Sequence, residues 1–268
     1  MNILVCVKQV PDTNEIRIDP VRNTLIREGV PSILNPYDSY ALEAAARLRD
    51  AVPGSRITVL SMGPAQASAA LRECLAMAAD SAWLASDRAF GGSDTLATSY
   101  ILSCAIRRVQ REEGTFDAIF CGKQATDGDT AQVGPEIAEH LGLPQVTYAL
   151  EAFAEEGGLR VLREAEDEKQ IVGVKLPCLV TFTKPAFDPR FPTVRRLLAS
   201  RAAPIHALTA ADLAGEIDLA RAGLSGSPTK VRKTFVPPRR KTGRLFGGET
   251  ADESAAALYE ALCAAQVL

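Results

Sequence analysis

The residues best suited to chemistry lie in one stretch, Gly122–Val133, where a polar loop follows an apolar run. The apolar run, Phe116–Cys121, predicts a buried strand. Asp129 or Thr130 is then expected to cap a helix that runs to about His140. A strand, a glycine-containing loop and a helix start form an anion site, because free backbone N–H groups converge there. The helix dipole also favours negative charge at this point. We therefore expect a nucleotide phosphate over Thr130, Ala131, Gln132 and Val133.

The same pattern also fits an ordinary strand-to-helix turn with an aspartate cap, and local pattern alone leaves both interpretations open. Gly122-Lys123 is not a Walker A loop, because the upstream glycine and the Ser or Thr after the lysine are missing. The same argument predicts a second anion site at another helix start, Gly91-Gly92-Ser93-Asp94-Thr95. The alternative there is a plain loop with Asp94 as a cap. Two anion sites would suit a dinucleotide or two nucleotides better than a mononucleotide.

Other kinds of site have little support. Asp127 and Asp129 could suggest a metal, but two such carboxylates in a glycine loop are more often caps. His140 and His206 are the only histidines, which excludes a histidine-rich metal site and leaves a Ser-His-Asp triad little to draw on. No acid–base pair or activated nucleophile stands out. Any chemistry would therefore belong to a cofactor.

Composition sets outer bounds on the protein class. The chain has 268 residues, 47% of them hydrophobic, which is enough for one large domain with a full core. A net charge of −3 argues against a general nucleic-acid binder, and no apolar run approaches the length of a membrane span. The N-terminus leads straight into a strand, so we expect no signal peptide. The cysteines are scattered without a CxxC pair, which predicts packed thiols and a cytoplasmic location; they are Cys6, Cys74, Cys104, Cys121, Cys178 and Cys263.

Strands and helices alternate through the first half of the chain. The helices are expected to start at Asn35-Pro36, where Asn caps and Pro takes the first position, and after Gly63, and over Ser93–Glu113. An extended excursion is expected over 17–26. Strands are expected over Asn2–Val10, Arg56–Ser61, Ala82–Ala85 and Phe116–Cys121. This alternation predicts an α/β fold, a parallel sheet with helices on both faces.

In such sheets, ligands bind beyond the carboxyl ends of the strands. Four of these ends are polar, small or rich in glycine, and Asn35 opens a helix in the same layer. Small residues let a ligand approach the backbone, and an asparagine or a backbone amide can read an adenine edge. The four ends are Lys8-Gln9, Met62-Gly63, Phe90-Gly91-Gly92 and residues 122–129.

After Pro144 the pattern changes to consecutive strands, which we interpret as an antiparallel extension over 145–153, 159–163, 170–174 and 178–183. A loop and a basic helix at Arg195–Arg201 follow. From residue 225 the chain becomes cationic and rich in proline, so it cannot bury a core of its own. We expect a main domain over 1–224 and a partner-binding arm over 225–268, the alternative being a disordered tail. A terminal helix at 249–264, with Leu258 and Leu262 on one face, favours the arm.

These residues resemble a known family along essentially the whole chain. The matching segments are long, ordered and specific. They are Val5-Cys-Val-Lys-Gln-Val-Pro-Asp12, Asn35-Pro-Tyr-Asp38 with Ala41-Leu-Glu43, Cys121-Gly-Lys-Gln-Ala125, Asp127-Gly-Asp-Thr-Ala-Gln-Val-Gly134, Val161-Leu-Arg163, Glu166-Asp-Glu168, Gln170, and Lys175-Leu-Pro177 with Leu179-Val-Thr181. The chain resembles the beta subunit of electron transfer flavoprotein, of the FixA type.

The resemblance implies an adenine-nucleotide alpha-hydrolase-like, Rossmann-like fold and a heterodimer with an alpha subunit that carries FAD. Such proteins pass electrons between dehydrogenases and other carriers. In ordinary members the beta pocket holds AMP, whereas in the electron-bifurcating branch it holds a second FAD that accepts hydride from NADH. In that branch one electron goes to ferredoxin or flavodoxin. The other goes through the alpha-subunit FAD to a partner such as an acyl-CoA dehydrogenase.

Two features make the chain similar to the bifurcating branch. Residues 89–99 resemble that branch's loop near the flavin and the nicotinamide, and Gly128 stands where ordinary members carry a bulkier acidic residue. The chain departs from the family pattern at Lys184, where a docking leucine is usual. That departure leaves the identity of the partner dehydrogenase open.

Carried over residue by residue, the resemblance assigns roles. The loop 183–190 would recognise the dehydrogenase through Lys184 and Arg190, and the arm would wrap on the alpha subunit. Asp94, Thr95 and Thr98 would hold the ribityl–pyrophosphate side, and Phe90, Gly91 and Gly92 would lie near NADH. The remaining cofactor-binding residues would be Cys6, Val7, Lys8, Asn35, Met62 and Gly63 at the adenosine end, Thr130, Ala131, Gln132 and Val133 at the phosphate, and Gly122, Gln124, Asp127, Gly128 and Asp129 in the loop before them. A module that senses nucleotides without a redox role is the alternative from another class.

Overall fold

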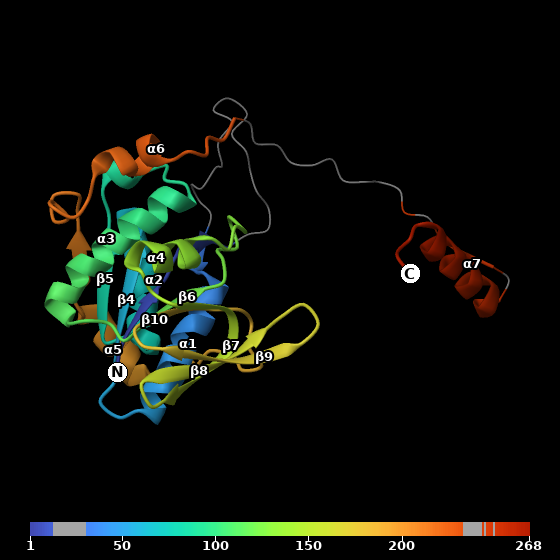
Figure 1. The fold of residues 1–268 in the computed structure, drawn as a ribbon, viewed down its shortest axis with the longest axis horizontal. Coiled ribbons are helices and arrows are strands. Elements are labelled where there is room, and N and C mark those ends of the chain that lie inside the picture. Colours follow the sequence, from blue (N-terminus) through green and yellow to red (C-terminus); the bar gives the residue numbers. More distant parts are fainter. Residues whose placement is uncertain (13–30, 233–242, 244, 249) are drawn as a thin grey trace. The chain divides into compact units, whose positions relative to one another are not determined.

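The computed structural model describes residues 1–12, 31–232, 243, 245–248 and 250–268 (Figure 1). These residues fall into two compact units, one that ends at Arg232 and one at the C-terminus. The excursion predicted over 17–26 lies outside the described residues.

The first unit is built on one sheet of nine strands, in the spatial order β11-β5-β4-β1-β6-β10-β7-β8-β9. The strands from β11 to β7 all pair in parallel, whereas β7, β8 and β9 pair antiparallel at one edge. The bounds are β1 Asn2–Cys6, β4 Arg56–Met62, β5 Ser81–Ala85, β6 Ala118–Gly122, β7 Gln145–Glu155, β8 Gly158–Glu164, β9 Lys169–Lys175, β10 Cys178–Phe182 and β11 His206–Leu208.

Helices cover both faces of the parallel part, as predicted. Alternate residues of β1 point to opposite faces: Ile3 and Val5 join the buried cluster under α1 and α2, whereas Leu4 joins the cluster under α3 and α4. Burial on both faces explains the nearly continuous apolar runs of these strands. The helices are α1 Pro36–Ala51, α2 Ser68–Met77, α3 Thr95–Glu113, α4 Val133–Leu141, α5 Val194–Ala202 and the short α6 Gly223–Gly226.

The first strand is shorter than expected. The predicted strand Asn2–Val10 breaks after Cys6, and β2 Gln9–Pro11 pairs with β3 Ser32–Leu34 in a separate two-stranded sheet. The break occurs because the N–H of Lys8 donates to the Asp38 side chain, at 2.7 Å, instead of to a neighbouring strand.

The prediction that residues 178–183 belong to the antiparallel extension is wrong. β10 pairs in parallel with both β6 and β7, inside the main sheet. All five of its residues are buried, which is the signature of a central parallel strand covered on both faces. The short strand β11, which extends the other edge beside β5, was not predicted.

The second unit contains the expected terminal helix, α7 Ala251–Ala264. Thr250 and Glu253 form a reciprocal capping box that defines its start. None of its residues is buried within the described chain. The boundary expected after residue 224 differs from the division of the structure, because the first unit continues to Arg232.

Candidate functional site

A cavity of about 980 Å³ lies at the carboxyl edge of the parallel strands, between the loops that follow β1, β4, β5 and β6. The cofactor-binding residues predicted from the sequence line it, with the exception of Asp129. Those that line it are Cys6, Val7, Lys8, Asn35, Met62, Gly63, Phe90, Gly91, Gly92, Asp94, Thr95, Thr98, Gly122, Gln124, Asp127, Gly128, Thr130, Ala131, Gln132 and Val133.

Asn35 precedes α1, as predicted, but its side chain does not cap that helix. Its Nδ2 donates to the carbonyl of Gln124 at 2.8 Å, and its Oδ1 accepts from the N–H of Thr126 at 3.2 Å. Only 1% of the residue is exposed. Asn35 therefore shapes the site by holding the loop after β6, and its amide is already engaged.

Asp38, in the first turn of α1, joins the segment after β1 to the end of β6. Its carboxylate accepts the N–H of Lys8 at 2.7 Å and the N–H of Gly122 at 3.1 Å. Burial raises the pKa of this carboxyl to about 7, although the hydrogen bonds to Lys8, Asn35 and Gly122 act in the opposite direction. Asp38 ends the motif Asn35-Pro-Tyr-Asp38, but the sequence alone indicates no role for it. The signal that could have found it is an acid in the first turn of a helix that starts at the edge where the site forms.

Gly122 is fixed by this contact. A Cβ on this residue would collide with the Asp38 carboxylate and the Tyr37 backbone. Close approach of α1 to the end of β6 thus requires glycine here. A second link between the same loops is the ion pair of Lys8 Nζ with Asp127 Oδ1, at 2.6 Å.

The helix predicted from Asp129 or Thr130 starts later. α4 begins at Val133, with Gln132 in the cap position and no side-chain cap. Asp129 and Ala131 both have φ of 54°, in the left-handed region, which a right-handed helix cannot include. The Asp129 carboxylate instead accepts a hydrogen bond from Gln124, which explains its absence from the cavity wall.

This later start places Thr130, Ala131 and Gln132 in a loop before α4. Within the described residues, no hydrogen bond uses the N–H of Thr130, Ala131 or Gln132 as donor. All three residues line the cavity, and α4 starts directly after them. Unpaired amides beside a helix N-terminus attract a phosphate through their dipoles and the helix dipole.

The second predicted anion site, at the start of α3, is capped by the side chain of Asp94. The Asp94 carboxylate accepts the N–H of Ala97 at 3.0 Å and the N–H of Thr229 at 2.9 Å. Burial opposes ionisation of Asp94, but these N–H donors outweigh it and hold its pKa below the usual value. A carboxylate at this position takes the place that a phosphate would need. Thr95 instead links α3 to Gln132 and Glu136 through its hydroxyl, with both oxygen–oxygen distances at 3.3 Å.

The loop after β5 is held by a distant segment. The N–H of Gly223 donates to Ser93 Oγ at 3.1 Å, and the N–H of Asp94 donates to Ser227 Oγ at 2.9 Å. Gly92 has φ of 75° and lies against the side chain of Leu224. Phe90 is only 4% exposed and belongs to a buried cluster, so the loop offers mainly backbone to the cavity.

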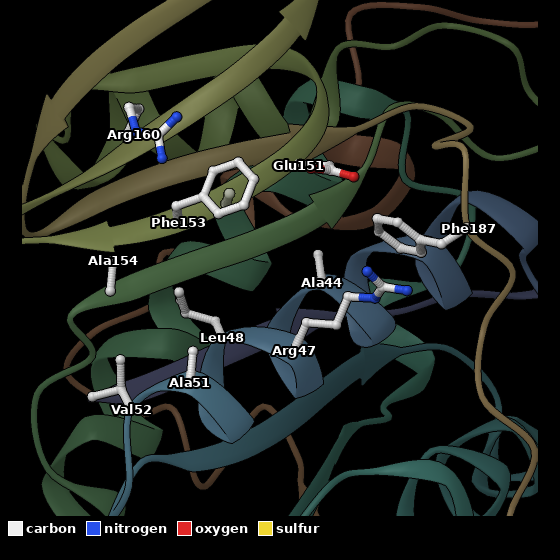
Figure 2. A pocket seen from close by; sticks show the side chains of 11 residues that line it. Ala44, Arg47, Leu48, Ala51, Val52, Glu151, Phe153, Ala154, Arg160 and Phe187 are labelled. Atoms are coloured by element: carbon white, nitrogen blue, oxygen red, sulfur yellow. The ribbon is translucent and has the colours of Figure 1, made fainter.

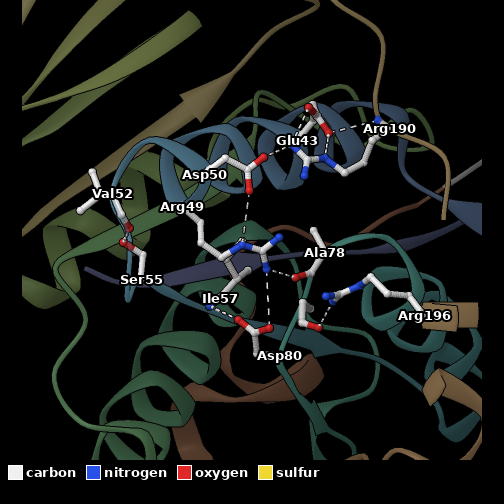
Figure 3. A network of polar contacts seen from close by, with 11 residues as sticks. Glu43, Arg49, Asp50, Val52, Ser55, Ile57, Ala78, Asp80, Arg190 and Arg196 are labelled. Atoms are coloured by element: carbon white, nitrogen blue, oxygen red, sulfur yellow. Dashed lines mark hydrogen bonds and ion pairs between the residues drawn. The ribbon is translucent and has the colours of Figure 1, made fainter. Parts of the chain in front are cut away.

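Lys184 and Arg190, the two residues predicted for partner docking, do not line the cavity, and their surroundings differ. Figure 3 shows Arg190 against α1, where its Nε contacts Glu43 Oε2 at 2.7 Å, and a terminal nitrogen contacts Asp50 at 2.9 Å. Burial opposes ionisation of Glu43, but the bonds from Arg190 and Arg47 lower its pKa overall. Arg190 therefore anchors its loop, whereas Lys184 is exposed.

A smaller cavity of about 450 Å³ lies between α1 and the strands β7 and β8 (Figure 2). Two guanidinium groups cover phenyl rings at its rim, Arg47 over Phe187 at 3.8 Å and Arg160 over Phe153 at 4.6 Å. Both arginines also pair with carboxylates, of Glu43 and Glu155. No motif in the sequence predicted this cavity, and it shares no lining residue with the larger one.

Among the described residues, no group of three or more His, Cys, Asp or Glu is arranged to hold a metal ion. In the same part of the chain, no helix is both long enough and apolar enough to cross a membrane. All six cysteines are free thiols, five of them buried and Cys263 exposed, which confirms the packed thiols except at the last position.

Comparison with known proteins identifies the family. A model described as the electron transfer flavoprotein domain matches residues 22–213. The chain is 53% identical to the electron transfer flavoprotein subunit beta of Megasphaera elsdenii, over 95% of this chain and 94% of that protein. It is 47% identical to the caffeyl-CoA reductase-Etf complex subunit CarD of Acetobacterium woodii, over 98% of each chain. It is 45% identical to protein FixA of Bradyrhizobium diazoefficiens, over 98% of this chain and 91% of that one. The chain therefore belongs to the electron transfer flavoprotein family, in its beta-subunit branch.

Proposed function

We propose that this chain is the beta subunit of an electron-bifurcating electron transfer flavoprotein. Its cavity would hold FAD, and this FAD would accept hydride from NADH. Electrons would pass to ferredoxin or flavodoxin and, through the FAD of an alpha subunit, to an acyl-CoA-type dehydrogenase. The observation that carries this proposal is a single cavity of about 980 Å³ that combines an unpaired amide loop with a second, glycine-rich loop.

The cavity fits a dinucleotide on structural grounds. Its volume is at the upper end of the range for cofactor pockets, about 300–1,000 Å³. The amides of residues 130–132 would hold the phosphates. A Cβ on Gly128 would meet nothing within 4 Å, so this part of the wall is open. When bound, a flavin supplies one- and two-electron redox chemistry, and the protein supplies the binding and the shape.

We assign the other roles by where each residue lies along the cavity wall. Residues 6–8, Met62 and Gly63 would lie along the adenosine end, and Asn35 would fix the loop beside it. Thr95 and Thr98 would face the ribityl–pyrophosphate side. The loop of Phe90, Gly91 and Gly92 would approach NADH through its backbone.

The partners are also part of the proposal. An alpha subunit would bind the C-terminal arm, whose helix α7 leaves Leu258 and Tyr259 exposed, by 44% and 62%. A dehydrogenase would contact the loop at Lys184, and the same loop exposes Phe191. The buried free thiols suit a reducing compartment, so we place the complex in the cytoplasm.

Two alternatives differ in cofactor content. An ordinary beta subunit would hold AMP and leave a single FAD in the heterodimer, and the one phosphate-binding loop before α4 would suit AMP as well. A nucleotide sensor would contain no flavin. The size of the cavity and the open wall at Gly128 favour the larger cofactor.

The test is the cofactor content of the complex after co-expression with its alpha subunit. We expect two FAD per heterodimer and bleaching of flavin absorbance by NADH. One FAD with one AMP would replace the proposal by the ordinary carrier. A complex without flavin would support the nucleotide sensor instead.

A further inference from the structure

Asp38 combines three properties that no other described carboxylate of the cavity wall combines. It lines the cavity, it is only 5% exposed, and its two oxygens accept the main-chain N–H of Lys8, after β1, and that of Gly122, where β6 leads into its loop. The loop after β6 carries the residues expected to hold phosphate, and the loop after β1 those expected at the adenosine end. One carboxylate therefore sets the distance between the two halves of the site.

We propose that Asp38 is the positioning residue of the nucleotide site, and that it takes up a proton when an anionic nucleotide enters the cavity. This inference rests on the proposed nucleotide function and adds to it a residue and a proton. Asp38 does not need to touch the reacting atoms. It acts through the N–H groups of Lys8 and Gly122.

The charges around Asp38 set the direction of this coupling. The nearby cation is Lys8, and its ammonium is already paired with Asp127. Burial raises the pKa of the Cys74 thiol, and the hydrogen bond with Cys6 together with burial raises that of Cys121. The Asp38 charge acts in the same direction on both, so the two thiols stay neutral. A phosphate would thus add negative charge to a site where a buried carboxylate has little opposing charge, and protonation relieves the repulsion.

The expected pH window follows from the carboxyl pKa of about 7 in the protein without ligand. Below that pH the group is already protonated, so an anion binds without proton uptake. Above it, binding requires a proton, and affinity falls by up to about tenfold per pH unit, the limit for one linked proton.

The probes are FAD and ADP-ribose, because their pyrophosphates do not titrate in this window, whereas the phosphate monoester of AMP titrates near pH 6. Each probe is titrated by calorimetry into the full-length chain after removal of bound nucleotide. Measurements at several values between about pH 6 and pH 8.5, in two buffers of different ionisation enthalpy, give both affinity and proton uptake. The wild type should take up close to one proton at the upper end, none at the lower end, and lose about three- to fivefold in affinity between pH 7 and pH 8.

Asp38→Asn should show a flat affinity profile and no proton uptake. The matched control is Asp117→Asn, because Asp117 also accepts a main-chain N–H, from Asn2 at 2.7 Å, but does not line the cavity. This control should behave like the wild type. Binding by the wild type without proton uptake at about pH 8 overturns the proposal even if Asp38→Asn does not fold. Proton uptake that persists in Asp38→Asn also overturns it, and failure of both probes to bind the wild type at any pH overturns the nucleotide function with it.

Discussion

Gly122 ends β6 and Gly128 lies in the loop that follows, and a side chain would have a different effect at each position. At Gly122, a side chain would collide with Asp38 and the backbone of Tyr37, so the residue is needed for the fold of the site. At Gly128, a Cβ would have open space, and the backbone is not in the left-handed region. Its importance therefore lies in what a larger or charged side chain would do to a ligand. The sequence alone marks both positions as loop glycines, because only the folded chain shows which neighbour comes close.

We expect Gly122→Ala to destabilise the protein by about 1–3 kcal/mol, the usual range for overpacking, because the first turn of α1 must move away from β6. The measurement is the free energy of unfolding by denaturant. Gly128→Ala is the matched control and should leave it unchanged. Equal stability of the two variants would show that α1 moves aside without strain.

We expect Gly128→Asp to lose the beta-site nucleotide while Gly128→Ala retains it. A Cβ at residue 128 would meet nothing within 4 Å, so the alanine variant has room, whereas the aspartate variant adds a negative charge beside the loop proposed to bind phosphate. At a separation of about 4 Å that charge costs about 1–4 kcal/mol near a protein surface, or at least about fivefold in affinity. Flavin per heterodimer is measured for each variant, with the alpha-site FAD as the internal reference. Two FAD in the aspartate variant would show that the flavin phosphates lie elsewhere.

At the scale of elements, the loop 183–193 is joined to α1 by an ion pair that the sequence does not reveal. Glu43 is 4% exposed on α1, and Arg190 follows it by more than a hundred residues. Nothing local predicts this pairing, because it depends on how β10 passes next to β6 and brings the loop over α1. A docking role for Arg190 is therefore difficult to test by charge reversal, whereas Lys184 is exposed and available for contact.

We expect Arg190→Gln to destabilise the protein by about 3 kcal/mol at neutral pH, since it leaves the buried Glu43 carboxylate without its main partner. The Glu43 pKa is lowered in the folded state, so its contribution is present above the unfolded value near 4.5 and is lost as pH falls through the folded value. Stability of the wild type should thus approach that of the variant in acid. Lys184→Glu is the control: it should keep full stability but slow electron transfer to the dehydrogenase in a salt-dependent way. A stability loss in both variants would mean that the loop is not held by Arg190 in particular.

The elements themselves were predictable to the extent that their signals are local. Apolar runs and caps located most of the strands of the parallel sheet, as well as α1, α3, α5 and α7. Three errors share one cause, which is that tertiary contacts decided the outcome. Lys8 leaves the sheet for Asp38, β10 enters the middle of the sheet, and left-handed residues delay the start of α4 to Val133. The residues that line the cavity could be anticipated from the sequence because they gather at one edge of the sheet, but the links through Asn35 and Asp38 needed the structure.

For the whole molecule, the boundary between the two units decides which deletion tests the C-terminal arm. Ser227 and Thr229 hold the start of α3 through Asp94, so this segment belongs to the cavity rim. Removal from residue 225 would therefore loosen the rim and remove the arm at once. Removal from residue 233, after the first unit ends at Arg232, separates the two effects.

We expect deletion of residues 233–268 to leave the first unit folded and able to bind nucleotide, but to abolish the stable heterodimer. The reason is that α7 buries none of its residues within the described chain and carries exposed Leu258 and Tyr259, an apolar surface that association would cover. Co-purification with a tagged alpha subunit measures the complex, and thermal unfolding measures the fold. The longer deletion, from residue 225, should lose the complex and also lower the unfolding temperature, because the contacts of Ser227 and Thr229 to Asp94 are gone. A chain shortened at residue 233 that still binds the alpha subunit in stoichiometric amount would show that the first unit carries the interface.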